Sequence, residues 1–358
     1  YYGIHTLRAL ENFQISNQKV GTHHHFIRAL AQVKKASAQT NLKFSKISEQ
    51  VSQAIQFACN ELIEFPEKWS TAFPLDVYQG GAGTSINMNS NEVLANIALE
   101  HLGFQKGQYE HIHPNDHVNK SQSTNDVYPT ALRLAVYYSL DELLAPLRGI
   151  IDSLHAKAVE FQPVVKMGRT QLQDAVPMTL GQEFRAFATL LKEDLKLIDN
   201  TRQLLLEVNL GATAIGTGVN TPKGYACEAV QALKEITGLP LIGAEDYVEA
   251  TSDCGVFIIL SSTLKRLAVY PYIQIGAVLL FVGVAVIALL TSKRAEQNRV
   301  WVGLSKETAH QLGTPTSSLL GWIEYLRSQD VDQTAVEEMN KDLTHLMKIV
   351  DRFSKDRK

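Results

Sequence analysis

The sequence of 358 residues predicts an all-α protein. We expect a helical domain and the beginning of a long helix bundle, followed by a transmembrane helix and a further helical segment. Apolar residues recur at helical spacing through residues 130–208 in amphipathic stretches long enough to form a bundle. An unbroken apolar run occupies residues 275–290. Residues 295–358 are again strongly helical in pattern.

Composition narrows the classes of function. A hydrophobic content of 45% is enough for two or more buried cores, and a net charge of -3 with a pI near 6.4 gives no reason to expect nucleic-acid binding. Cys59, Cys227 and Cys254 are widely spaced and form no C-x-x-C, which favours buried thiols in a reducing compartment. We therefore expect small-molecule or protein partners in the cytoplasm. No secretory leader is evident after Tyr1.

The first part of the chain combines helical patterns with one glycine-rich turn. Residues 26–40 predict a helix. His23 to His25 are consecutive and point in different directions, so a solvated loop is favoured over a metal site. Residues 79–90 form a glycine-rich turn before a helix expected at 91–102, without the lysine of a phosphate loop. Thr84 in this turn could bind an anion beside backbone N–H groups, or the turn could simply cap the helix.

Three histidines follow, at positions 111, 113 and 117. Their spacing suggests metal ligands, but Pro114 interrupts the helix that would align them. Neither a cysteine nor a second carboxylate cluster follows. We therefore expect no metal site in this segment.

The segment Ser121–Asp126 places small polar groups before a helix expected from about Pro129. Ser123, Thr124 and Asn125 offer two hydroxyls and an amide beside exposed N-terminal N–H groups. Such an arrangement can bind a carboxylate or an amine. An N-cap box would use the same residue types, and the residues alone favour neither interpretation.

Residues 168–184 form a second polar turn that leads into a long helix. Thr170 and Gln171 supply donors and acceptors but no strong nucleophile. The turn is suited to holding a small carboxylated molecule by hydrogen bonds, and a polar loop with a capped helix is the alternative. Residues 210–222 carry three glycines and predict a turn near the pocket.

Five motifs stand in the order and spacing of the aspartase/fumarase superfamily, and residues 1–269 resemble its aspartate ammonia-lyase branch. Thr124 and Gln171 distinguish the chain from fumarases, which usually carry serine and histidine there. The motifs are GGAGTSINMNSNEVLAN, HPNDHVNKSQSTND, GRTQLQDAVPMTLGQEF, LGATAIGTGVNTP and EATSDCG.

The resemblance implies anti-elimination of ammonia from L-aspartate to give fumarate, without a cofactor or a metal. It implies a cytoplasmic homotetramer in which each pocket is shared among three subunits, so that apolar helix faces of the truncated bundle would be exposed. The substrate-binding positions implied are Thr84, Ser123, Thr124, Asn125, Thr170 and Gln171.

The resemblance also implies a catalytic serine on a flexible loop of pattern G-S-S-x-M-P-x-K-x-N. No segment of the sequence carries that pattern, so no catalytic base is assigned. Proton removal beside a carboxylate builds an enediolate that needs both a base and preorganised donors. We therefore expect this carbon–nitrogen lyase chain to be slow or inactive by itself.

Beyond Val269 the chain resembles a bacterial sensor histidine kinase. Residues 270–292 predict the transmembrane helix, bounded by charged residues on both sides. The resemblance implies that the following helices form a helical-hairpin dimerisation segment. In it His310 would be the phospho-acceptor, with Thr314 at the position used for dephosphorylation and Pro315 bending the helix. Without an ATP-binding segment this chain could not phosphorylate itself. A membrane-bound kinase fragment is thus the alternative function.

The two resemblances imply different compartments. Lys293 and Arg294 would place the C-terminal side in the cytoplasm and the lyase part outside the inner membrane, whereas the lyase belongs inside. The simplest interpretation is a chimera of two unrelated sequences joined near residue 270. We expect four domains: the lyase N-terminal domain at 1–122, the central bundle at 123–269, the membrane helix at 270–292 and the phospho-acceptor segment at 293–358.

Overall fold

The computed structural model divides the chain into two compact units, Tyr1–Leu267 and Ala268–Lys358. It describes residues 1–79, 83–171 and 173–252, and then 264–265, 268, 286–287, 289–297, 308, 312, 315–328 and 332–355.

The first unit begins with four helices and three short helical turns. Its α4 starts seven residues before the helix predicted at 91–102, since Gly83 adopts a left-handed conformation and Thr84 already lies in the helix. The helices are α1 (Ile4–Asn12), α2 (His24–Lys43), α3 (Glu49–Glu64) and α4 (Thr84–His101), and the turns are η1 (Val20–Thr22), η2 (Ser70–Ala72) and η3 (Pro114–Val118).

Helix α2 lies at the centre of the core. It packs against α3, α4 and α5, and also against α7 (Tyr225–Thr237). Ile27 and Leu30 are completely buried, and so is Lys34 on the same helix. Because α2 is covered on several sides, polar side chains on its buried faces need partners inside the protein; these are Gln32, Lys34, Ser37, Thr40 and Asn41.

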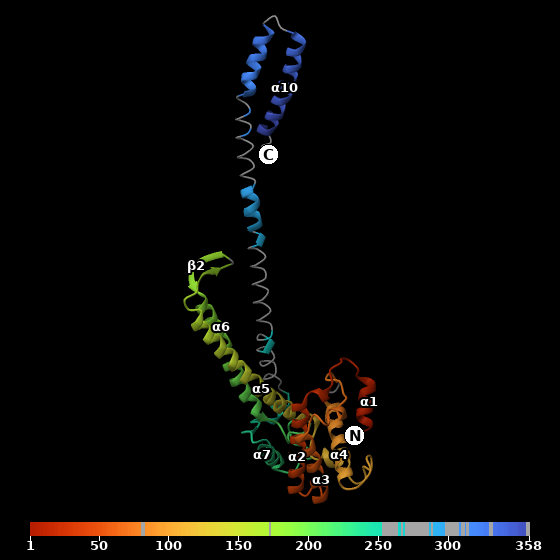
Figure 1. Cartoon of the computed structure of the whole chain (residues 1–358). Helices are drawn as coiled ribbons and strands as arrows, with labels where there is room; N and C mark the ends of the chain where they lie inside the picture. Colours follow the sequence, from red (N-terminus) through yellow and green to blue (C-terminus); the bar gives the residue numbers. More distant parts are fainter. Residues whose placement is uncertain are drawn as a thin grey trace. The chain divides into compact units, whose positions relative to one another are not determined.

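Helix α5 (Thr124–Glu160) is 37 residues long and forms a two-helix arm with the returning helix α6 (Leu180–Gln203). Figure 1 shows a hairpin at the far end of this arm. Its strands are β1 (Val165–Thr170) and β2 (Gln173–Thr179), which pair antiparallel.

This hairpin corrects the all-α prediction, because the sequence pattern indicates a polar turn without strands at this place. Gln171, in the connection between the strands, has a φ of 48°. Tight hairpin turns with positive φ usually carry glycine or asparagine, so the sequence gives no hairpin signal here. In the described part of the first unit, the other strand pairings are a short parallel pair and an isolated antiparallel bridge between Lys19 and Asp76.

The remaining elements of the first unit are η4 (Leu204–Leu206), β3 (Glu207–Val208), α7, β4 (Ile242–Gly243) and α8 (Tyr247–Ser252). Of these, η4 and β3 contact α5, and α7 contacts α2. Strands β3 and β4 form the parallel pair. The loop between β3 and α7 is hydrogen-bonded to the start of α5.

The second unit contains a helical stretch at 315–327 and helix α10 (Gln333–Lys355). Ile323, Val336 and Leu343 are buried together in a small core of their own. Among the described residues, no helix combines the length and apolar character needed to span a bilayer. Most of the predicted membrane segment 270–292 lies outside the described residues, as does His310.

Candidate active site

The start of α5 is built by a capping box. The Ser123 hydroxyl accepts a hydrogen bond from the Asn125 N–H at 3.3 Å, and the Asp126 carboxylate accepts one from the Ser123 N–H at 2.9 Å. The helix therefore begins at Thr124, five residues before the predicted Pro129. The N-cap alternative is thus present in the structure, and a capped helix start can still present N–H groups to an anion.

The start of α4 lies beside this first turn of α5. A side-chain amide of Asn87 donates to the Thr124 hydroxyl at 3.1 Å. Gly83 packs so closely on the Tyr128 ring that an added Cβ would lie 2.3 Å from it. These contacts bring Thr84, the first residue of α4, into the neighbourhood of Thr124.

The loop after β3 closes the same region from another side. The Asn125 side chain donates to the Ala214 carbonyl at 2.7 Å, and the Asn209 side chain donates to the Asn125 carbonyl at 3.1 Å. Residues 210–222 therefore form a turn beside the predicted pocket residues. Asn125 itself is exposed to solvent, whereas Asn209 is buried.

A buried cation lies behind this cluster. The Lys34 ammonium donates to the side-chain carbonyls of Asn119 at 2.8 Å and Gln122 at 3.0 Å. Burial lowers the pKa of Lys34 to about 7, although the negative charge of Asp126 acts in the opposite direction. A group with this pKa changes charge near neutral pH.

Thr170 and Gln171 lie elsewhere. They occupy the exposed tip of the β1–β2 hairpin, beyond the C-terminal end of α5. A helix rises 1.5 Å per residue, so the 37 residues of α5 separate its two ends by about 55 Å. The chain brings Thr84, Ser123, Thr124 and Asn125 together but leaves Thr170 and Gln171 at the other end of the arm.

Comparison with known proteins covers this part of the chain. Residues 1–270 match the family model described as Lyase. The chain belongs to this lyase family. Over 269 residues it is 60% identical to aspartate ammonia-lyase of Escherichia coli strain K12, covering 75% of this chain and 56% of that protein. Over 268 residues it is 53% identical to aspartate ammonia-lyase of Corynebacterium glutamicum, covering 51% of it. The chain thus spans little more than half the length of these curated relatives.

Solved structures match the same share of the chain. The chain superposes on fumarate lyase:delta crystallin from Brucella melitensis bound to cobalt with a TM-score of 0.72 and 50% identity, covering 75% of this chain and 58% of that one. For a recombinant class II fumarase from Schistosoma mansoni the TM-score is 0.66 and the identity 34%, covering 75% and 60%. The mostly helical architecture is therefore fumarate-lyase-like.

Several residues around the candidate site escape prediction from the sequence. The pattern places Lys34 where apolar residues give way to basic ones, although it follows Ile27 by seven positions and so shares its apolar helix face. This position on the apolar face is the one feature of the sequence that could have predicted the burial of Lys34. Asp126 has the signal of a residue three positions after an N-cap serine. The sequence around Asn87 and Asn209 does not predict their roles, because their hydrogen-bond partners come from distant segments.

The histidines at 111, 113 and 117 each make a local contact. His111 stacks on Phe104 with ring centroids 3.8 Å apart. The His113 ring accepts from the backbone N–H groups of Asn115 and Asp116, while the His117 ring accepts from the His113 N–H. Within the described part of the chain, no three histidine, cysteine or acidic side chains are grouped to hold a metal.

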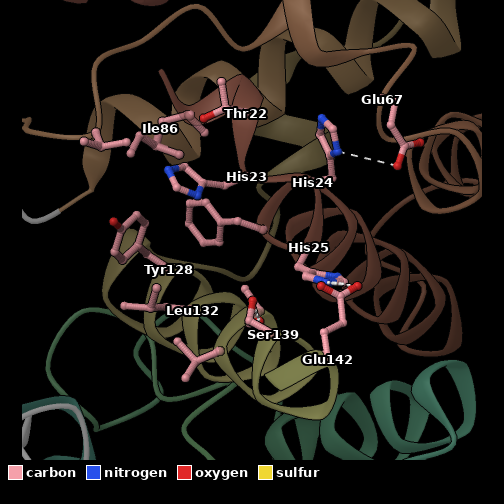
Figure 2. Close-up of a pocket in the computed structure, with 15 residues that line it drawn as sticks. Thr22, His23, His24, His25, Glu67, Ile86, Tyr128, Leu132, Ser139 and Glu142 are labelled. Carbon is pink, nitrogen blue, oxygen red and sulfur yellow. Dashed lines mark hydrogen bonds and ion pairs between the residues drawn. The ribbon is translucent and has the colours of Figure 1, made fainter. Parts of the chain in front are cut away.

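The run His23–His25 borders a hollow of about 520 Å³ between α2, α4 and α5. Figure 2 shows His24 turned toward Glu67 and His25 toward Glu142, at distances of 3.5 and 3.0 Å. The solvated-loop prediction was wrong for His24 and His25, because they open helix α2. The lining of the hollow also includes the apolar side chains of Phe26, Ile86, Leu132 and Val136.

Proposed function

We propose that the first unit binds aspartate or fumarate and belongs to a carbon–nitrogen lyase that eliminates ammonia from L-aspartate. The observation that carries this proposal is the convergence of hydroxyl, amide and N-terminal N–H groups where α4 meets α5. Similarity to aspartate ammonia-lyases at 60% and 53% identity supports the choice of substrate.

The proposed binding mode follows from the chemistry of the reaction. Loss of a proton beside a carboxylate places extra negative charge on its oxygens, and donors aimed at those oxygens stabilise it. Ser123 and Thr84 supply hydroxyls, and the first turn of α5 supplies N–H groups. Asn125 is assigned to the amino group of the substrate.

Thr170 and Gln171 complete the site from a second copy of the chain. The length of α5 prevents them from reaching Ser123 within one chain. The hairpin that carries them exposes apolar side chains, including Val165, Met167 and Val176. Exposed apolar surface of this kind suits a subunit contact.

Calorimetry with fumarate tests the binding proposal. Ser123→Ala should weaken fumarate binding at least tenfold, because hydrogen bonds to charged groups contribute about 1.5–3 kcal/mol. Ser153→Ala is the matched control, since Ser153 lies on the same helix and donates to the Gly149 carbonyl of its own backbone. Equal affinities of the two variants would refute the assignment of Ser123.

Mixing variants tests the shared site. Thr170→Val should remove most fumarate binding, while Thr189→Val on the same arm should not, because the Thr189 hydroxyl bonds the Arg185 carbonyl. A mixture of Thr170→Val and Ser123→Ala chains should regain part of the lost binding, since some pockets then combine two intact contributions. A mixture that binds no better than either variant contradicts sharing between copies.

We further propose that the chain turns over aspartate slowly or not at all, because its sequence contains no G-S-S-x-M-P-x-K-x-N segment. Loss of a general base typically lowers a rate by about 10²- to 10⁴-fold. Absorbance at the fumarate band should stay flat with millimolar aspartate. Robust turnover by protein freed of host aspartase would show that the chain supplies its own base.

The second candidate function is that of a histidine-kinase phospho-acceptor segment in a membrane-anchored protein. The observation that favours it is the amphipathic α10, which packs with residues 315–327 around Ile323, Val336 and Leu343. A separately supplied kinase ATP-binding domain should label the chain with phosphate at His310, and His310→Gln should abolish the labelling. Equal labelling of both proteins would remove this candidate.

A further inference from the structure

Asp126 joins two segments that are distant in the sequence. One carboxylate oxygen accepts from the Ser123 N–H at 2.9 Å. The other accepts from the N–H groups of Gly211 at 3.1 Å and Thr213 at 2.9 Å. We propose that Asp126 is a positioning residue that fixes loop 209–218 against the start of α5 and thereby sets the geometry of the donors that bind the substrate. This inference rests on the proposed function.

The loop needs such an anchor because its backbone is unusual. Gly211 has a φ of 93°, and Thr213, which is not a glycine, has a φ of 61°. A side chain in the left-handed region is strained and persists only where surrounding contacts hold it. Asp126 accepts from the N–H of both residues, so it holds the loop at these two left-handed positions.

A second set of contacts connects the loop to Asn125. The Asn125 side-chain amide donates to the Ala214 carbonyl, one residue after Thr213. The Asn209 amide donates to the Asn125 carbonyl and makes a further bond to the Thr251 hydroxyl at 3.2 Å. A shift of the loop therefore moves both the side chain and the backbone of Asn125.

Burial makes these contacts sensitive to the identity of residue 126. The Asp126 side chain is completely buried. Burial raises the pKa of its carboxyl group, while the three N–H donors and the charge of Lys34 favour the ionised form. Asparagine has the same shape, but its NH₂ group cannot accept a hydrogen bond. Asp126→Asn would therefore set a donor against at least one of the three N–H groups.

Glu92 provides a matched control. It is also buried, and its carboxylate accepts from the N–H groups of Gly3, His5 and Thr6 and from the Thr6 hydroxyl. These bonds hold the start of α1. Glu92→Gln thus removes a carboxylate with a comparable set of backbone donors, at a place that is hydrogen-bonded to the start of α1 rather than to the proposed substrate-binding residues.

The experiment compares fumarate affinity and amide hydrogen exchange for the full chain and both variants. Asp126→Asn should weaken fumarate binding at least tenfold and speed exchange at Gly211 and Thr213. Glu92→Gln should speed exchange at Gly3 and Thr6 and leave the fumarate affinity within about twofold of the original. A purely structural role for Asp126 would instead make the two variants bind fumarate equally well at equal stability.

A gentler variant covers the case in which Asp126→Asn does not fold. Asn209→Ala removes the amide that reaches Asn125 without changing charge, and it should weaken fumarate binding about threefold or more. Wild-type affinity in a folded Asp126→Asn or Asn209→Ala protein overturns the inference. Failure of the unmodified chain to bind fumarate overturns the proposed function instead, while exchange at Gly211 and Thr213 still reports whether Asp126 holds the loop.

Discussion

The region around α2 and the arm formed by α5 and α6 differ in how far their side chains find contacts within the chain. Around α2, apolar residues are fully enclosed, and even the Lys34 ammonium has two amide partners. The hairpin at the end of the arm exposes Val176 by 66% and Val165 by 72%. The first region is complete within one chain, whereas the second presents surface that another copy could cover. Stability and assembly should therefore respond to different substitutions.

The largest expected effect is on stability. Leu30→Ala should lower the free energy of unfolding by about 2–5 kcal/mol, because it leaves a cavity in a fully buried site. Val176→Ala on the hairpin should change it by less than about 0.5 kcal/mol. Urea unfolding followed by circular dichroism measures both. Comparable losses would mean that the arm belongs to the same cooperative core as α2.

Substitution of two glycines should change the stability by a smaller amount. Gly83→Ala should destabilise by about 1–3 kcal/mol, since φ is 89° and the new Cβ would meet the Tyr128 ring. Gly149→Ala, in the C-terminal half of α5 with open space around it, should stabilise by about 0.5–1 kcal/mol. Thermal unfolding should shift in opposite directions. A shift of the same sign would show that Gly83 can relax.

The pH dependence of stability tests the contribution of Lys34. Its pKa is about 7 in the folded protein against an ordinary value of 10.5 for an exposed lysine, so between these values the unfolded chain binds more protons. Stability from this group therefore rises as pH increases from 7 toward 10.5, by at most about 1.4 kcal/mol per pH unit. Lys34→Met should flatten that slope in urea titrations. An unchanged slope would place its origin in other groups.

The smallest effect on stability is expected for substitutions that change self-association. Val165→Ser with Val176→Ser should weaken self-association by removing apolar surface from the hairpin, while unfolding stays nearly unchanged. Ile15→Ser is the control, because Ile15 is exposed on the loop after α1. Sedimentation velocity measures association. Loss of association in the control as well would show that the hairpin has no special part in it.

Much of the helical architecture could be predicted because it depends on near neighbours in the sequence. The spacing that predicts a helix at 26–40 is realised within α2, and the helix expected at 91–102 lies largely within α4. The sequence pattern places the starts of α4 and α5 too late. At Thr84 the left-handed Gly83 decides the start, and at Thr124 the capping box does.

The sequence by itself determined the helical periodicity, the capping residues and the polar segments that carry the proposed substrate-binding groups. Only the tertiary structure decided which groups meet. Asp126 reaches Gly211 and Thr213 because the chain returns through α6 and β3, and Lys34 becomes buried because α3, α5 and α7 cover α2. Thr170 is held far from Ser123 because the continuous helix α5 cannot fold back on itself. Local preferences act over a few residues, whereas these distances depend on how whole helices pack.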